Sequence, residues 1–182
     1  MLNKPIWALT ASELCKKTKN NELSATDITV ACLEQTKKVN PQLNAIVDDM
    51  SDEAIKRAES LDSEVAAGKS KGRLFGVPVT VKINVDQKGY ATSNGVTALK
   101  NLIAKTNAPI VDHLMDAGAV FVGRTNTPEF SFRADTENPL YGRTNNPWGK
   151  HLSPGGSSGG ASSAVMAGMC ALAHGNDIGG SL

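Results

Sequence analysis

The chain has 182 residues, of which 40% are hydrophobic and 20% charged, and this length and composition are typical of a folded protein with one core. Its 19 Lys and Arg balance 18 Asp and Glu to a net charge of +1, and no basic block stands out, so we expect no direct nucleic-acid partner. No run approaches the roughly 18 apolar residues of a membrane span, and the start lacks the apolar core of a signal peptide, so we expect no membrane partner.

Three cysteines are scattered without the spacing of a metal site or a redox pair: Cys15, Cys32 and Cys170. An odd number of unpaired cysteines is typical of reduced thiols that fill space in a core. Together with the missing signals, they predict a cytoplasmic location.

The first 70 residues are predicted to be helical. The strings from Thr10 to Glu13 and from Ser24 to Asp27 have the Ser/Thr-x-x-acid pattern that satisfies the free amides at a helix start. We expect the second helix to stop at about Val39, because Asn40-Pro41 follows. Apolar residues at helical spacing predict a third helix over 51–66.

The pattern changes after Gly72 to a strand, a helix and a strand. The apolar, β-branched run 75–81 and the run 119–122 are typical of buried strands, and 108–117 reads as the helix between them. This order predicts a βαβ unit with parallel strands, although about two dozen residues of loop precede the helix.

A polar stretch over 125–154 is followed by a predicted small-residue helix over 161–169 and a strand over 170–173. There is no internal repeat and no clear boundary. We therefore predict one α/β layer structure with an incomplete sheet, forming a single domain over 1–182 with a helical region over 1–70 and a sheet-forming core over 73–182.

A glycine-rich string, Pro154-Gly-Gly-Ser-Ser-Gly-Gly160, is the densest chemical signal. Glycines let backbone amides approach a ligand closely, and at a helix start such amides bind an anion or a developing oxyanion. A flexible linker or turn is the alternative. A phosphate loop is excluded, because Ala161-Ser162 stands where that motif needs a lysine, and no dinucleotide fingerprint occurs.

Two further positions attract attention. In Asp177-Ile-Gly-Gly-Ser181, glycines before a serine can aim backbone amides at whatever the hydroxyl attacks, although an isolated Gly-Gly-Ser is more often a simple turn. Lys82 ends a buried run, where desolvation lowers a lysine pKa toward the range of a base; the alternative is that it extends out to solvent.

The three histidines do not support a histidine-based or metal site. No pair of His113, His151 and His174 has the spacing of metal ligands, so we expect no metal and no cofactor. His174 is close in sequence to Ser181, and we interpret it as structural or substrate-lining rather than as a general base.

Five strings taken together resemble the amidase signature family, whose members hydrolyse amides with a Ser–cisSer–Lys arrangement. They lie in the family's order within residues 73–182: Gly76-Val-Pro-Val-Thr-Val-Lys82, Gly123-Arg-Thr-Asn-Thr-Pro-Glu-Phe130, Gly142-Arg-Thr-Asn-Asn-Pro-Trp148, Ser153-Pro-Gly-Gly-Ser-Ser-Gly-Gly160 and Gly175-Asn-Asp-Ile-Gly-Gly-Ser181. The resemblance implies a mixed sheet flanked by helices and hydrolysis of a small-molecule amide through an acyl-serine.

The resemblance also implies the role of each site residue. Ser181 matches the nucleophile, Ser157 the serine that follows a cis peptide bond and relays the proton, and Lys82 the base. The backbone amides of Ile178, Gly179, Gly180 and Ser181 match the oxyanion hole, and Ser158 and Asp177 match residues that hold the loops.

Two departures from the family's pattern matter. The family commonly has Lys-Asp-Asn at the base, whereas this chain has Lys82-Ile83-Asn84, which puts the local network in question. The chain also stops at Leu182, before the family's following arginine and most of its substrate pocket. We therefore expect a truncated amidase domain that needs either a second copy or a missing C-terminal part.

Three functions remain open at this point. A free-standing amidase leads, because the string Thr127-Pro-Glu-Phe130 looks more like such enzymes. The amidase (A) subunit of a tRNA-dependent amidotransferase is the second. The third is an inactive remnant, since an incomplete sheet exposes an unpaired edge.

Overall fold

The structure is a computed structural model and describes residues 4–182. It forms a mixed α/β fold, as the sequence predicts. Its elements in chain order are η1 (Ile6–Ala8), α1 (Ala11–Lys19), α2 (Ala25–Leu43), β1 (Ile46–Asp49), α3 (Ser51–Ala66), β2 (Pro78–Lys82), η2 (Thr97–Leu99), α4 (Pro109–Asp116), β3 (Val120–Thr125), η3 (Glu129–Ser131), β4 (Glu137–Asn138), β5 (Gly142–Arg143), α5 (Gly159–Met166) and β6 (Leu172–Ala173).

A four-stranded sheet in the order β1-β3-β2-β6 forms the centre of the fold. Strand β2 pairs in parallel with β3 and with β6, and β1 pairs antiparallel with β3. The predicted βαβ unit is confirmed as β2-α4-β3. Because parallel strands end at the same edge, Lys82 on β2 and Thr125 on β3 lie side by side there, and open α/β sheets bind ligands at this edge.

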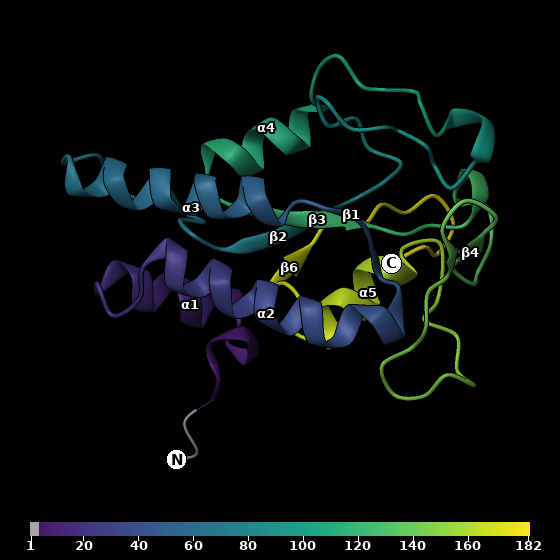
Figure 1. Ribbon diagram of the computed structural model, residues 1–182, viewed down its shortest axis with the longest axis horizontal. Coiled ribbons are helices and arrows are strands. Elements are labelled where there is room, and N and C mark those ends of the chain that lie inside the picture. Colours follow the sequence, from purple (N-terminus) through teal and green to yellow (C-terminus); the bar gives the residue numbers. More distant parts are fainter. Residues whose placement is uncertain (1–3) are drawn as a thin grey trace.

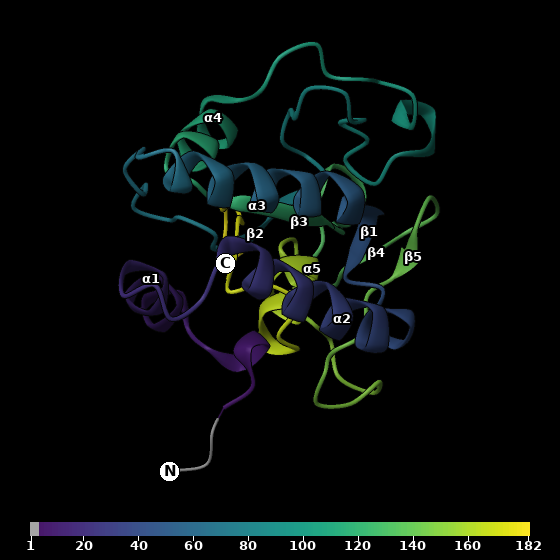
Figure 2. The same ribbon diagram turned by 60° about the vertical axis from the view of Figure 1, so that its left-hand side comes forward.

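Helices cover both faces of the sheet. In Figures 1 and 2, α4 lies on one side of the strands, with α2 and α5 on the other. Successive residues of β3 divide between two core clusters: Val120 and Val122 pack with residues of α2, α3 and α5, while Phe121 packs with Val111 of α4. Both faces of β3 are thus buried, which explains why its sequence reads as a continuous apolar run.

The predicted helix starts are confirmed. The Thr10 hydroxyl accepts a hydrogen bond from the Glu13 amide while the Glu13 carboxylate accepts from the Thr10 amide, and Ser24 and Asp27 form the same reciprocal pair. These polar residues begin the helices and take no part in the site.

The predicted end of the second helix is wrong, because α2 continues through Pro41 to Leu43. Proline removes one backbone donor, and in the last turn this affects a single hydrogen bond. The helix closes at Asn44, which has left-handed backbone angles and donates its amide to the Asn40 carbonyl at 2.7 Å.

Three short strands were not predicted. Strand β1 lies within the region expected to be helical, and it has only four residues before the next helix begins. Strands β4 and β5 form a two-stranded ribbon inside the polar stretch. Segments this short show no periodicity, and they form here because tertiary contacts hold them: Ile46 of β1 packs on Gly123, where a side chain would collide with it.

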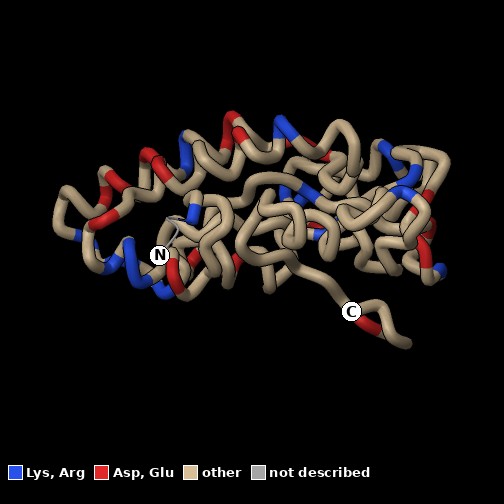
Figure 3. The backbone as a smooth tube through the Cα atoms, turned by 90° about the horizontal axis from the view of Figure 1, so that it is seen from below, with Lys and Arg blue, Asp and Glu red and all other residues tan. Residues whose placement is uncertain are grey.

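Charge is distributed without a large patch of one sign. Acidic and basic residues are interspersed along much of the backbone in Figure 3. Among residues 4–182, no helix is both long and apolar enough to cross a bilayer.

Candidate active site

Lys82 is the last residue of β2, and its side chain has no solvent exposure. The alternative in which it extends out to solvent is therefore excluded. Its Nζ lies 2.7 Å from Ser157 Oγ, 3.2 Å from Ser158 Oγ and 3.0 Å from Asn176 Oδ1. The end of the strand thus brings the amine to a cluster of oxygen atoms contributed by two distant loops.

Burial changes the acid–base behaviour of this lysine. Desolvation lowers the pKa of Lys82 from 10.5 to about 8, and the negative charge of Asp177 opposes that shift in part. An amine with a pKa of about 8 is neutral in a useful fraction of molecules near neutral pH, and only the neutral form accepts a proton.

Ser157 is fixed by a packed loop. Its peptide bond with Gly156 is cis, and its carbonyl accepts a hydrogen bond from Thr127 Oγ1 at 2.9 Å. A side chain on Gly160 would place its Cβ 2.5 Å from both the backbone nitrogen and the backbone oxygen of Asn126. The glycine-rich string is therefore a close-packed, buried segment, and the flexible-linker alternative is excluded.

Ser181 lies in the exposed turn that follows β6. The Ser158 amide donates to the Ser181 carbonyl at 3.3 Å, which brings this turn against the glycine-rich loop. Within residues 4–182, the Ser181 side chain makes no hydrogen bond to Lys82 or to Ser157. The structure thus joins Lys82, Ser157 and Ser158 through side chains and reaches Ser181 through its main chain.

The backbone amides of this turn converge on Asp177. Its carboxylate accepts from the Gly180 amide at 2.5 Å and from the Leu182 amide at 3.0 Å. Hydrogen bonds from backbone amides, that of Gly180 foremost and that of Ser181 next, lower the pKa of this carboxyl. The turn therefore presents the convergent donors that an oxyanion needs, and here they hold the chain's own carboxylate.

The predicted oxyanion-hole residues are open to solvent. Gly179 and Gly180 are exposed, and Ile178 is 96% exposed, on a C-terminal segment that projects from the rest of the chain in Figure 3. The roles of Ile178, Gly179, Gly180 and Ser181 stay predictions.

His174 lies at the edge of this site. Its amide donates to the Thr80 carbonyl at 2.8 Å, and burial, followed by the charge of Lys82, lowers the pKa of its imidazole. No hydrogen bond joins its ring to Ser181 among the described residues. Its position agrees with a residue that lines the site.

Three polar residues of this cluster were given no role from the sequence: Asn84, Thr127 and Asn176. Asn176 contacts Lys82 directly, Asn84 pairs with Asn176, and Thr127 holds the Ser157 carbonyl. All three lie within or directly beside the strings that carry the family resemblance. Their position there was the available signal, but which partners they meet depends on the fold.

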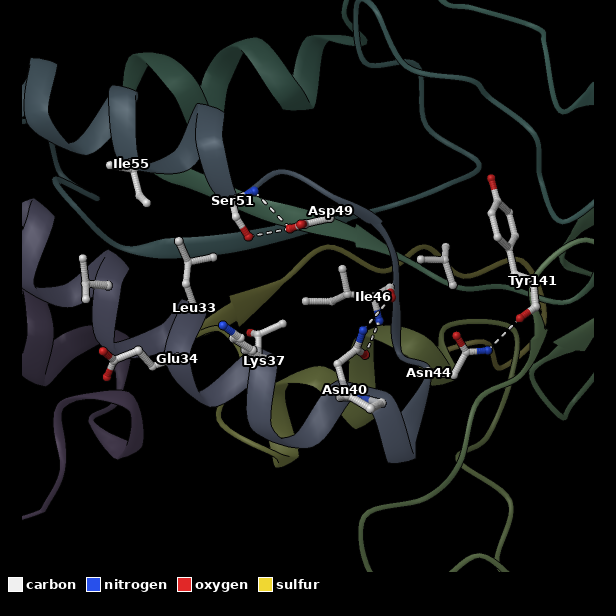
Figure 4. A pocket seen from close by; sticks show the side chains of 14 residues that line it. Leu33, Glu34, Lys37, Asn40, Asn44, Ile46, Asp49, Ser51, Ile55 and Tyr141 are labelled. Carbon is white, nitrogen blue, oxygen red and sulfur yellow. Dashed lines mark hydrogen bonds between the residues drawn. The ribbon is translucent and has the colours of Figure 1, made fainter.

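A cavity of about 890 Å³ lies elsewhere, between α2, β1 and the start of α3 (Figure 4). Its walls include Leu33, Ile46, Ile55 and Tyr141, and none of the predicted site residues lines it. The cavity is therefore separate from the cluster around Lys82.

Comparison with known proteins decides the family. The family model described as Amidase matches residues 27–182, which is most of the chain. The chain belongs to the amidase family.

Relatives and solved structures agree with this assignment. The amidase chain is 50% identical over 178 residues to an indoleacetamide hydrolase of Bradyrhizobium diazoefficiens, covering 98% of this chain and 34% of that protein. It is 38% identical to the amidase (A) subunit of the glutamyl-tRNA(Gln) amidotransferase of Carboxydothermus hydrogenoformans, covering 97% of this chain and 36% of that protein.

Among solved structures, a fatty acid amide hydrolase superposes with a TM-score of 0.92 at 33% identity, covering 97% of this chain and 31% of the other. The amidase chain therefore spans about a third of the length of the relatives that it matches.

Proposed function

We propose that this chain carries the reacting residues of an enzyme that hydrolyses a carboxylic amide to an acid and ammonia or an amine. The observation that carries the proposal is the contact between buried Lys82 and Ser157, 2.7 Å apart at the carboxyl end of the sheet. Membership of the amidase family and the named amide hydrolases among its relatives support it.

In the proposed acylation step, neutral Lys82 takes the proton of Ser157 Oγ while Ser157 takes the proton of Ser181 Oγ. The Ser181 oxygen attacks the carbonyl carbon, and amides of the 178–181 turn stabilise the oxyanion. The relay then returns the proton to the leaving nitrogen as the C–N bond breaks. Water hydrolyses the acyl-serine in the reverse sense.

The proposed arrangement requires Ser181 Oγ to approach Ser157. The hydrogen bond from the Ser158 amide to the Ser181 carbonyl already brings the two loops together, so a rotation within the exposed turn supplies the remaining approach. Asp177 would then release some amides of the turn to the substrate oxygen.

For the substrate, we propose a small carboxylic amide, with indoleacetamide as the first compound to test. The basis is the 50% identity to the indoleacetamide hydrolase. We place the enzyme in the cytoplasm, which agrees with three free cysteines, two of them buried, among the described residues.

A second candidate function is that of the amidase subunit of a tRNA-dependent amidotransferase. Several relatives with that name are 36–41% identical to this chain, which is lower than the identity to the indoleacetamide hydrolase. Glutaminase activity that appears only with a second subunit would favour this candidate.

The proposed function is tested in the full-length protein that contains this segment, with a fluorophosphonate probe and mass spectrometry of the labelled peptide. We expect labelling at Ser181, none in Ser181→Ala, and a rate lowered about 100-fold or more in Lys82→Ala. Indoleacetamide hydrolysis should be lost in the same variants. Labelling at another serine, or an unchanged rate in Lys82→Ala, would exclude this mechanism.

A further inference from the structure

Two asparagine side chains form a reciprocal amide pair beside Lys82. The Asn176 Nδ2 group donates to Asn84 Oδ1 at 3.1 Å, and the Asn84 Nδ2 group donates back to Asn176 Oδ1 at 3.2 Å. Asn84 Nδ2 also donates to Ser131 Oγ at 3.0 Å. The two amides therefore fix each other's orientation.

This pairing determines which atom of Asn176 faces the lysine. Its Oδ1 lies 3.0 Å from Lys82 Nζ. A flipped Asn176 would set its NH₂ group against both the lysine amine and the Asn84 NH₂ group, placing donors against donors. The side chain of Asn176 thus offers only an acceptor to Lys82.

Ser158 offers a second acceptor. Its hydroxyl donates to the backbone carbonyl of Asn176 at 3.3 Å, so its single proton is already used. Its Oγ, 3.2 Å from Lys82 Nζ, consequently accepts from the amine.

The two acceptors account for the hydrogens of a neutral lysine. A neutral amine carries two N–H groups and one lone pair. If the N–H groups point at Asn176 Oδ1 and Ser158 Oγ, the lone pair is left for the third neighbour, Ser157 Oγ, at 2.7 Å. In this arrangement the Ser157 proton lies on the path to the nitrogen.

We propose that Asn176, held by Asn84, is a positioning residue that aims the lone pair of Lys82 at Ser157. This inference rests on the proposed function, because it needs Lys82 to act as the base. It gives a role to two side chains beside a lysine whose next residue, Ile83, is apolar where the family commonly has an acid.

The experiment measures the rate of Ser181 labelling by a fluorophosphonate probe across about pH 6 to 10 in the full-length protein. Asn176→Asp replaces the amide oxygen by a carboxylate of the same size. A carboxylate at this distance favours the charged lysine, so the acid limb should move to higher pH by about 1–3 units. Asn176→Leu removes the acceptor without adding charge, and we expect a rate about tenfold lower with no upward shift of the limb.

Asn101→Asp is the matched control, since it makes the same chemical change at an exposed position outside the cluster. The other titratable groups coupled to Lys82, Asp177 and His174, are unchanged in every variant. A shift seen in Asn176→Asp and absent in Asn101→Asp is therefore attributable to position 176.

The two proposals fail in different ways. Wild-type rate and an unshifted limb in Asn176→Asp would overturn the positioning role while leaving the base in place. An unchanged rate in Lys82→Ala would overturn the proposed function itself. If Asn176→Leu does not fold, the shift in Asn176→Asp still decides, because that variant differs at one atom position.

Discussion

At the scale of single residues, the burial of Lys82 sets the chemistry of the site. An ammonium ion loses its hydration inside a protein, so burial favours the neutral amine. The compensating groups around it are three oxygen acceptors rather than a carboxylate in direct contact. A buried lysine arranged in this way is poised to accept a proton.

The pKa of Lys82 predicts the pH dependence of the reaction. The neutral form is the active one, and it becomes populated as the pH rises through a pKa of about 8, so the rate of Ser181 labelling should rise with pH around that value. Lys82→Met should remove this limb, whereas Lys88→Met, at an exposed position of the same segment, should retain it. A wild-type limb in Lys82→Met would exclude Lys82 as its source.

A second buried cation, Arg124, has a structural part. Its guanidinium donates to Asp48 at 3.0 Å and to the carbonyls of Ala91 and Val85 at 2.7 and 2.8 Å. It therefore ties β3 to β1 and to the long loop that follows β2.

Arg124→Ala should lower the free energy of unfolding by about 3–5 kcal/mol, because it leaves Asp48 and two carbonyls without their partner. Chemical denaturation of the variant measures this loss. Arg133→Ala, at an exposed position, is the control and should change stability by less than about 0.5 kcal/mol. Equal effects of the two substitutions would contradict the structural part given to Arg124.

At the scale of elements, the start of α5 is held against β1 and the end of β3 by glycine. Position 160 faces the Asn126 backbone and the Ala45 carbonyl so closely that no Cβ fits. Helix propensity alone would favour alanine there by about 1 kcal/mol. Packing and propensity therefore predict opposite effects for one substitution.

We expect packing to prevail in Gly160→Ala, which should lose about 1–3 kcal/mol of stability and lower the rate of Ser181 labelling, since the Ser157 loop leads into this helix. Thermal unfolding and probe kinetics measure the two effects. Val165→Ala, in an exposed position of the same helix, should alter stability by about 0.5 kcal/mol or less. A gain of stability in Gly160→Ala would show that propensity prevails.

At the scale of the whole molecule, the sheet has an edge at β6 with apolar residues around it. Strand β6 pairs only with β2, and the exposed side chains nearby in sequence include Met166, Leu172, Ile178 and Leu182. Unpaired edges and exposed apolar groups favour association with other chains.

We therefore expect the 182-residue chain by itself to self-associate with rising concentration and to lack amide hydrolysis. Light scattering and an indoleacetamide assay on the purified chain measure the two properties. The full-length protein is the control and should be active and less prone to associate. A monodisperse, active 182-residue monomer would refute this expectation.

The sequence by itself determined the helix starts, the βαβ unit and the family. Capping pairs such as Thr10 with Glu13 are local, and the buried strands are continuous apolar runs, so both are visible in the chain. Local patterns failed where the decisive contact is distant: Pro41 inside α2, and β1 beside Gly123.

Only the tertiary structure decided how the site is assembled. Lys82, Ser157 and Asn176 are far apart in the sequence, and their contacts follow from strand β2 ending beside two loops that the sheet brings together. The sequence identified the lysine as a candidate base, but its burial and the direction of its lone pair depend on neighbours that no local pattern specifies. The physical reason is that desolvation and hydrogen-bond geometry are properties of the folded surroundings.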